Sequence, residues 1–267
     1  MIRWTPPTGR RPKLSILVCA LQSRAAQSEN LLRELEHQCR VLGDVEILVA
    51  EDNGERPSGA KRNDLIRNST GEYFCFVDDD DFVAPYYAKA IRDAADGQVD
   101  VVTFDMLRVD IEGGGGRIHS FSIHNQDRER ISSGYWKMTA NHLCAWRRDV
   151  GTKVAFPDNL GYADDVFWYR PLIDSGLVKI ERHLDLVLYF YLWGGMATSN
   201  QSRDSIKATK QWQGGGIECF RRRGEIFLAN KPLEKSEGEA AVECRNKFGH
   251  VVVIPRKDLI RTGIVRT

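Results

Sequence analysis

Four consecutive aspartates, Asp78 to Asp81, follow the apolar segment Glu72–Val77 and precede Phe82. Adjacent carboxylates repel one another, so such a run lowers stability unless a cation lies among them. Its hard oxygen atoms favour Mg²⁺ or Mn²⁺, which bind through one or two protein carboxylates together with substrate phosphates. The alternative is a solvated turn that caps the next helix, because Asp is favourable at a helix N-terminus.

The first 106 residues alternate between short apolar runs and segments of helical periodicity. We predict strands at Leu14–Leu21, Val45–Ala50, Glu72–Val77 and Val99–Met106. Helices are predicted over 25–42 with Ser28 as its cap, over about 60–68, and from Pro85 to about Asp96. This alternation predicts an α/β sheet with right-handed crossovers. Ligands bind at the carboxyl ends of strands in such sheets, where the acidic clusters 51–52 and 78–81 both fall.

The second half has a different pattern. Residues 107–123, with glycines at 113–116, predict a β-hairpin with a loose turn. Residues 164–175 are expected to be helical despite Pro171, and Leu184–Trp193 is a further strand. Residues 196–216 are polar and Gly-rich and are predicted to form a loop, for which Trp193-Gly194-Gly195 is a candidate hinge.

Composition indicates an ordinary globular protein of 267 residues, with 42% hydrophobic and 28% charged residues and a net charge of +1. Residues 203–267 hold 14 Lys and Arg against 8 Asp and Glu, which favours either an anionic partner or a solvated basic surface. The six cysteines form no CxxC or Cys/His cluster, so we expect reduced thiols, no zinc finger and a cytoplasmic location. We expect neither a signal peptide nor a membrane-spanning segment.

Residues 59–82 read GAKRNDLIRNSTGEYFCFVDDDDF. This segment resembles the family-two glycosyltransferases of the GT-A fold, with Arg62-Asn63, Gly71-Glu72-Tyr73 and Asp78–Asp81 in register. Residues 46–54 are similar to the family's second strand, and residues 161–170 to its Glu-Asp motif and following helix. The resemblance covers about residues 13–200.

The resemblance implies a Rossmann-like, mixed but mostly parallel sheet flanked by helices, with a β-hairpin insertion. It divides the chain into a GT-A domain over 1–202 and a small basic C-terminal extension over 203–267. Within the domain, the nucleotide-sugar half is about 13–106 and the acceptor half about 107–202.

The resemblance also implies roles for the donor-side residues. Asp78 and Asp80 match the DxD pair, of which the first contacts the ribose and the second ligates the metal on the diphosphate. Asp52 and Glu51 match the acidic strand end that reads the nucleobase, usually uracil. Arg62 matches a basic residue near the nucleotide.

Two adjacent carboxylates are candidates for the catalytic base. Asp165 matches the base of inverting members and Asp164 stands where they usually have Glu, so either could serve. Family members often have a further metal-ligating His late in the fold, but residues 189–200 contain none. His142 and His183 are lone histidines, which are more often structural than ligating.

Elementary chemistry agrees with this reading. A diphosphate that leaves an anomeric carbon gains negative charge, which Mn²⁺ or Mg²⁺ neutralises as a Lewis acid. The incoming hydroxyl must lose a proton, which a positioned carboxylate accepts. We therefore expect an inverting transferase that moves a sugar from a nucleotide-sugar, with UDP as the expected nucleotide, to a hydroxyl acceptor.

The acceptor remains open at this stage, with a carbohydrate or glycolipid ranked ahead of a hydroxymethylated DNA base. The DNA alternative rests on the basic tail, including Arg221-Arg222-Arg223, which could follow a phosphate backbone. A nucleotidyltransferase would be expected to show a Gly-rich loop after the first strand, and residues 19–24 have no glycine. A non-catalytic sugar- or nucleic-acid-binding module would not need the acidic pairs at 78–80 and 164–165.

Overall fold

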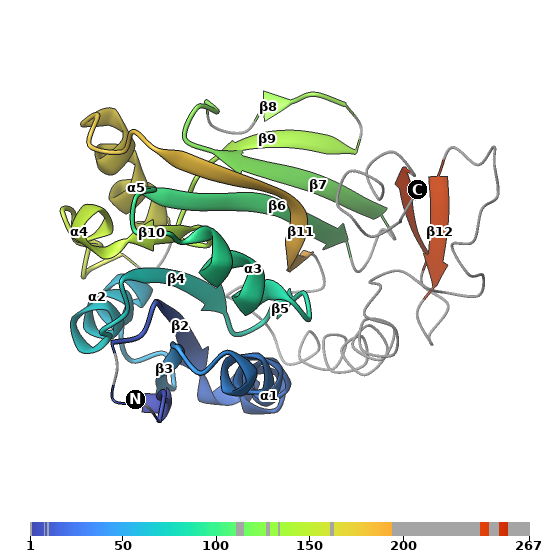
Figure 1. Cartoon of the computed structure of the whole chain (residues 1–267). Helices are drawn as coiled ribbons and strands as arrows, with labels where there is room; N and C mark the ends of the chain where they lie inside the picture. The colour runs from blue at the N-terminus through green and yellow to red at the C-terminus, as the bar shows by residue number, and fades with distance from the viewer. Residues whose placement is uncertain are drawn as a thin grey trace.

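One mixed sheet of 11 strands forms the centre of the molecule (Figure 1). The computed structural model describes residues 2–7, 9, 11–110, 115–126, 129–132, 134–160, 163–193, 241–245 and 251–255. The strands are β1 (Ile2–Trp4), β2 (Leu14–Leu21), β3 (Val45–Asp52), β4 (Tyr73–Asp78), β5 (Phe82–Val83), β6 (Val101–Asp110), β7 (Gly115–Ser122), β8 (Glu129–Arg130), β9 (Tyr135–Thr139), β10 (Ala145–Arg147) and β11 (Glu181–Trp193), with β12 (Ala241–Arg245) and β13 (Val251–Pro255) as a separate pair. The helices are η1 (Gln22–Arg24), α1 (Ala25–Leu42), α2 (Ser58–Asn68), α3 (Tyr87–Ala94), α4 (Arg148–Gly151) and α5 (Asp164–Asp174).

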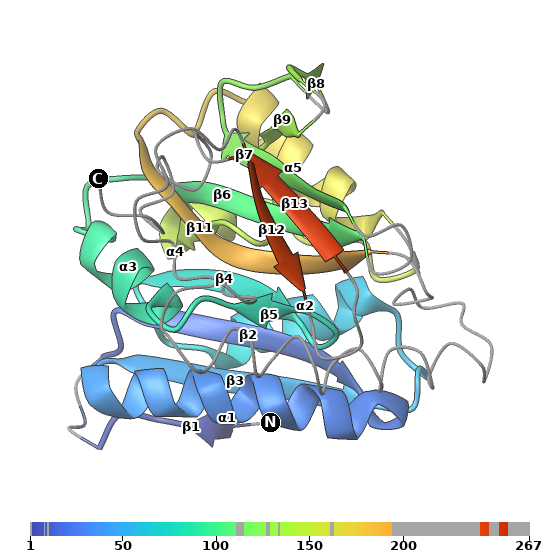
Figure 2. The same cartoon turned by 90° about the vertical axis from the view of Figure 1, so that its right-hand side faces the viewer.

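The strand order is β1-β3-β2-β4-β10-β6-β7-β9-β8, with β11 beside β6 and β5 beside β11. Strands β3, β2 and β4 are parallel neighbours, which fits their nearly continuous apolar runs, buried on both faces. Helices α1 and α2 lie on opposite sides of β2 and β3 (Figure 1), and α1 extends along β3 (Figure 2). The α/β prediction for the first half is confirmed.

The register of these strands brings the acidic clusters to one edge of the sheet. Leu21 of β2 pairs with Asp52 of β3, and Cys19 of β2 pairs with Asp78 of β4. The two acidic strand ends therefore flank the carboxyl end of β2, as the sequence predicts.

Antiparallel pairing is concentrated in the second half. The short strand β10 lies between β4 and β6 and is antiparallel to both, so β6 runs parallel to β4 without touching it as a neighbour. The predicted hairpin exists as the antiparallel pair β6–β7, and β11 runs parallel to β6 along its length. This arrangement gives the mixed sheet that the resemblance implies.

Several local predictions need correction. Helix α1 begins at Ala25, and the Ser28 hydroxyl donates to the Ala25 carbonyl inside the helix, so Ser28 is not the cap. The helix expected to open at Pro85 begins at Tyr87. Helix α5 forms as predicted with Pro171 inside it.

Some expectations fall where the structure gives no description. The predicted loop 196–216 lies outside the described residues, as does the 203–267 extension apart from β12 and β13. Among the described helices, none combines the length and apolarity that crossing a bilayer would require.

Asn63 on α2 fastens the segment that precedes α5. Its amide nitrogen donates to the Phe156 carbonyl at 2.8 Å and to Asp158 Oδ1 at 2.6 Å, and its amide oxygen accepts from the Phe156 N–H at 3.0 Å. The Phe156 ring stacks on Trp168 of α5, with ring centroids 4.6 Å apart. The buried side-chain amide of Asn63 therefore links α2 to α5 through Phe156.

We predict that Asn63→Ala lowers the free energy of unfolding by about 2–4 kcal/mol, because it leaves the buried N–H and C=O of Phe156 without their partner. Asn68→Ala is the matched control on the same helix, since Asn68 is exposed and, among the described residues, donates to the Asp64 carbonyl alone. Urea unfolding of both variants measures the difference. Equal destabilisation in the two variants would contradict the role assigned to Asn63.

Candidate active site

The four aspartates after β4 point toward different partners. Asp79 accepts from the Leu21 N–H at 2.8 Å, and Asp81 accepts from the Tyr189 hydroxyl at 2.8 Å and the Leu192 N–H at 2.9 Å. These two buried carboxylates brace the turn against β2 and β11. Asp78 is the most exposed of the run, with 32% of its side chain accessible.

Arg24, the last residue of η1, supplies positive charge to this turn. Its guanidinium pairs with Asp79 at 2.7 Å and also contacts Asp80. Burial raises the pKa of Asp80 to about 8 and that of Asp79 to about 6, although Arg24 opposes both increases. The turn therefore carries more buried carboxylate than this one cation balances.

His142 connects two predicted parts of the site. Its Nδ1 lies 3.0 Å from Asp165 Oδ2 and its Nε2 lies 3.5 Å from Asp78 Oδ2. The Phe76 N–H of β4 donates to the His142 carbonyl at 3.1 Å, which fixes this backbone beside the strand end. Burial acts to lower the pKa of His142, but the carboxylates of Asp78 and Asp165 outweigh it and raise the pKa.

Arg62 of α2 lies buried on the other side of Asp78. Its guanidinium pairs with Asp164 at 2.6 Å and approaches Asp78 at 3.5 Å. Its central carbon also lies 5.6 Å from the Phe76 ring centroid and 5.4 Å from that of Phe156. Burial acts to raise the pKa of Asp78, but His142 and Arg62 outweigh it, so the pKa lies below its usual range.

The two candidate bases differ in their surroundings. Asp164 is 5% exposed and is engaged by Arg62, whereas the Asp165 side chain is 21% exposed and contacts His142. Burial acts to raise the pKa of Asp165, but the hydrogen bond and charge of His142 lower it, so this carboxylate is ionised at neutral pH.

Backbone conformation at the start of α5 orients this pair. Ala163, directly before Asp164, has φ of +58°, and it is the non-glycine residue with positive φ in the described structure. An L-residue in this region carries strain, which proteins keep where a site needs a particular backbone direction. Both carboxylates then lie in the first helical turn, where the helix dipole favours negative charge.

The end of β3 presents the other predicted acidic pair. Asp52 Oδ1 accepts from Lys61 Nζ at 2.9 Å and from the Gly54 N–H at 2.9 Å, whereas the Glu51 side chain is exposed. Burial acts to raise the pKa of Asp52, but Lys61 lowers it below the usual value. Lys61 lies beside Arg62 in the sequence, and its salt bridge was not predicted.

Trp193 ends β11 with 42% of its surface exposed. The Arg108 guanidinium lies 3.8 Å from the centroid of its ring. Gly194 and Gly195, the rest of the predicted hinge, lie outside the described residues.

The residues at the β4 end fit a divalent cation. Asp78 and Asp80 offer hard carboxylate oxygens of the kind that Mg²⁺ and Mn²⁺ prefer. Burial and the neighbouring carboxylates of Asp79 and Asp78 raise the pKa of Asp80, so a bound cation would favour its ionised form. A cation that binds Asp80 would have to displace the Arg24 guanidinium or bind beside it.

Comparison with known proteins gives a family and a fold. Residues 26–154 match the profile of Glycosyl transferase family 2. The solved structure of S. aureus TarS 1-349 in complex with UDP-GlcNAc aligns with a TM-score of 0.50 and 16% identity, covering 78% of this chain and 67% of that chain. A second solved structure, S. aureus TarS 1-349, aligns with a TM-score of 0.48 and 18% identity over 67% of this chain, and the alignment spans 60% of that chain's length. No curated protein matches this chain.

The profile match spans the ends of β3 and β4 and the acidic turn, and the shared architecture agrees with the mixed sheet. Residues 26–154 therefore form a domain that matches glycosyltransferase family 2, and the chain shares with the TarS structure a mixed α/β sheet flanked by helices.

Proposed function

We propose that the enzyme is an inverting glycosyltransferase that moves a sugar from a UDP-sugar to a hydroxyl group of a carbohydrate or glycolipid, with a divalent cation. One observation carries the proposal: His142 joins Asp78 at the end of β4 to Asp165 at the start of α5. Asp78 is expected beside the donor and Asp165 is expected to accept the proton, and the two carboxylates share His142 as a partner.

The donor side is supported by the charges around the strand ends. Asp80 and Asp78 would hold Mn²⁺ or Mg²⁺, which supplies Lewis-acid stabilisation of the departing diphosphate. Arg62 offers a buried positive charge next to Asp78, which favours an anionic ligand there. Asp52 and the exposed Glu51 lie at the neighbouring strand end, where they would contact the nucleobase. The UDP-GlcNAc bound by the TarS structure is consistent with UDP as the nucleotide.

Proton transfer is assigned to Asp165. Its carboxylate is ionised and partly exposed, and it would accept the proton of the acceptor hydroxyl as the oxygen attacks the anomeric carbon. His142 holds the carboxylate in place through a 3.0 Å contact. Asp164, engaged by buried Arg62, would position that arginine rather than accept a proton. A single displacement of this kind inverts the anomeric configuration.

The carbohydrate or glycolipid acceptor is preferred because Trp193 is 42% exposed at the end of β11, and aromatic rings stack on sugars. Transfer to hydroxymethylated DNA bases depended on basic residues beyond 203, which lie outside the described residues. A screen of UDP release separates the two, run with glycan acceptors and with hydroxymethylated DNA. DNA-dependent release without glycan-dependent release would contradict the preferred acceptor.

We predict that Asp165→Asn lowers turnover at least about a hundredfold while donor binding is retained, because the amide cannot accept the proton. Asp174→Asn is the matched control, an exposed residue at the other end of α5. Turnover is measured as UDP release, and donor binding by calorimetry. Near-normal turnover in Asp165→Asn would transfer the base role to another group.

We predict that UDP with Mn²⁺ raises the melting temperature of the protein and that Asp80→Ala abolishes the UDP-dependent part of the rise. Asp149→Ala is the control, because Asp149 is exposed and pairs only with nearby Arg147 among its described contacts. Thermal unfolding is recorded with Mn²⁺ alone and with Mn²⁺ plus UDP. An equal UDP-dependent shift in Asp80→Ala would remove Asp80 from the cation site.

A further inference from the structure

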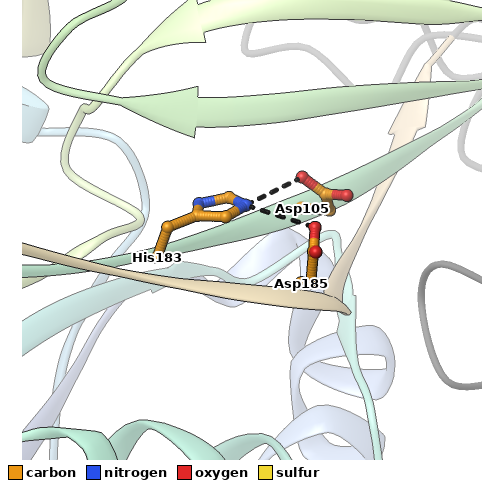
Figure 3. Close-up of side chains that lie close together, drawn as sticks. All are labelled: Asp105, His183 and Asp185. Carbon is orange, nitrogen blue, oxygen red and sulfur yellow. Dashed lines mark ion pairs between the residues drawn. The ribbon is translucent and has the colours of Figure 1, made fainter.

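A second group of charged residues lies away from the β4 end, on strands β6 and β11. Asp105 of β6 is fully buried, and His183 and Asp185 of β11 point toward it (Figure 3). His183 Nε2 lies 3.6 Å from Asp105 Oδ1 and 3.9 Å from Asp185 Oδ1. One ligand atom from each residue falls within 4.8 Å of the others.

The face of the sheet explains why these residues meet. Phe104 of β6 packs against Tyr87 of α3, with ring centroids 6.0 Å apart. Successive side chains of a strand point to opposite faces, so Asp105 points away from α3. The cluster thus occupies the face of β6 and β11 that is opposite α3.

The pairing of β11 with β6 is irregular at Asp185. Leu184 pairs with Phe104, but the next β6 residue, Asp105, pairs with Val187. Residues 185 and 186 are therefore extra in β11, which makes a bulge. Bulges redirect side chains and occur often beside functional sites. His183 and Asp185 are two residues apart, so regular alternation would also place both side chains on the face of Asp105, and at the bulge Asp185 Oδ1 lies 3.9 Å from His183 Nε2.

Hydrogen bonding determines which ring nitrogen faces the carboxylates. The Thr103 hydroxyl donates to Glu181, so its oxygen is left to accept from His183 Nδ1, which lies 3.1 Å away. Nδ1 therefore carries a hydrogen, and Nε2 faces the carboxylates of Asp105 and Asp185. A lone pair on Nε2 would repel both carboxylates unless a cation lay between them. Metal-ligating histidines commonly have their other N–H held in this way.

We propose that Asp105, His183 and Asp185 bind a divalent transition-metal ion, with Zn²⁺ as the expected ion and water in the remaining positions. One imidazole nitrogen and two carboxylate oxygens suit Zn²⁺, whose ligands lie about 2.0–2.2 Å from the metal. Small rotations of His183 and exposed Asp185 bring the three atoms to the closer spacing that this requires. The ion would fasten the β11 bulge to β6, and it shares no ligand with the proposed donor site.

The test is calorimetric titration of metal-stripped protein with Zn²⁺ in the absence of nucleotide. The wild-type protein should bind Zn²⁺. His183→Gln and Asp185→Asn should each raise the Kd for Zn²⁺ at least about tenfold. Thr103→Val should raise it about tenfold, because the His183 ring loses the hydrogen bond that orients it. His124→Gln is the matched control, because His124 is exposed and contacts Glu181 at 3.8 Å without facing the cluster. Its Zn²⁺ affinity should equal that of the wild type.

Asp185→Asn keeps the shape of an exposed side chain, so its metal-free melting temperature should match the wild type and separate ligand loss from misfolding. Zn²⁺ affinity unchanged in both His183→Gln and Asp185→Asn would overturn the proposal. Absence of Zn²⁺ binding by the wild type would also overturn it. Because no nucleotide is present, either result leaves the UDP-dependent measurements on Asp80 unaffected.

Discussion

The crowding of carboxylates at the end of β4 is the constraint on which the site depends. Three of the four adjacent aspartates are buried and Asp78 is partly exposed, and like charges at this spacing in a low-dielectric interior require compensation. Compensation comes from separate segments: Arg24 after β2, Arg62 on α2 and His142 before β10. Each cation fixes its own segment against the strand end. Electrostatic balance therefore assembles the site from both halves of the sheet.

The four aspartates of the run 78–81 have different structural roles. Asp79 and Asp81 face inward and receive hydrogen bonds from β2 and β11, so their loss would release the turn from the sheet. The Asp78 N–H donates to the Tyr189 hydroxyl, which itself donates to Asp81. This arrangement holds β11 over the turn and leaves Asp78 and Asp80 as the members available to a ligand. The two inward-facing carboxylates thus hold in position the pair that we propose binds the ligand.

Sequence reasoning predicted the parts of the fold that carry strong periodicity. Strands β2, β3 and β4 are apolar runs buried on both faces, and α1 repeats its apolar residues at helical spacing. Strand β10 was not predicted because three residues carry no periodicity, and its identity comes from pairing with β4 and β6. The carboxylates at the ends of β3 and β4 could be predicted because they follow apolar strands, whereas Asp164 and Asp165 were predicted from the resemblance of residues 161–170 to a family motif. Arg24 and His142 could not, since they meet the acidic turn across 56 and 64 residues of sequence, distances over which local pattern gives no information.

The two histidine–carboxylate groups show how one hydrogen bond changes the cation that suits each group. Both nitrogens of His142 face carboxylates, so a ring with two N–H groups satisfies Asp78 and Asp165 together, in agreement with its raised pKa. His183 instead directs Nδ1 to Thr103, and only Nε2 meets carboxylates, two of them. A single proton on Nε2 can point at one oxygen, whereas a metal ion attracts both. The first arrangement therefore suits an imidazolium that links donor and acceptor sides of the site, and the second suits a bound metal.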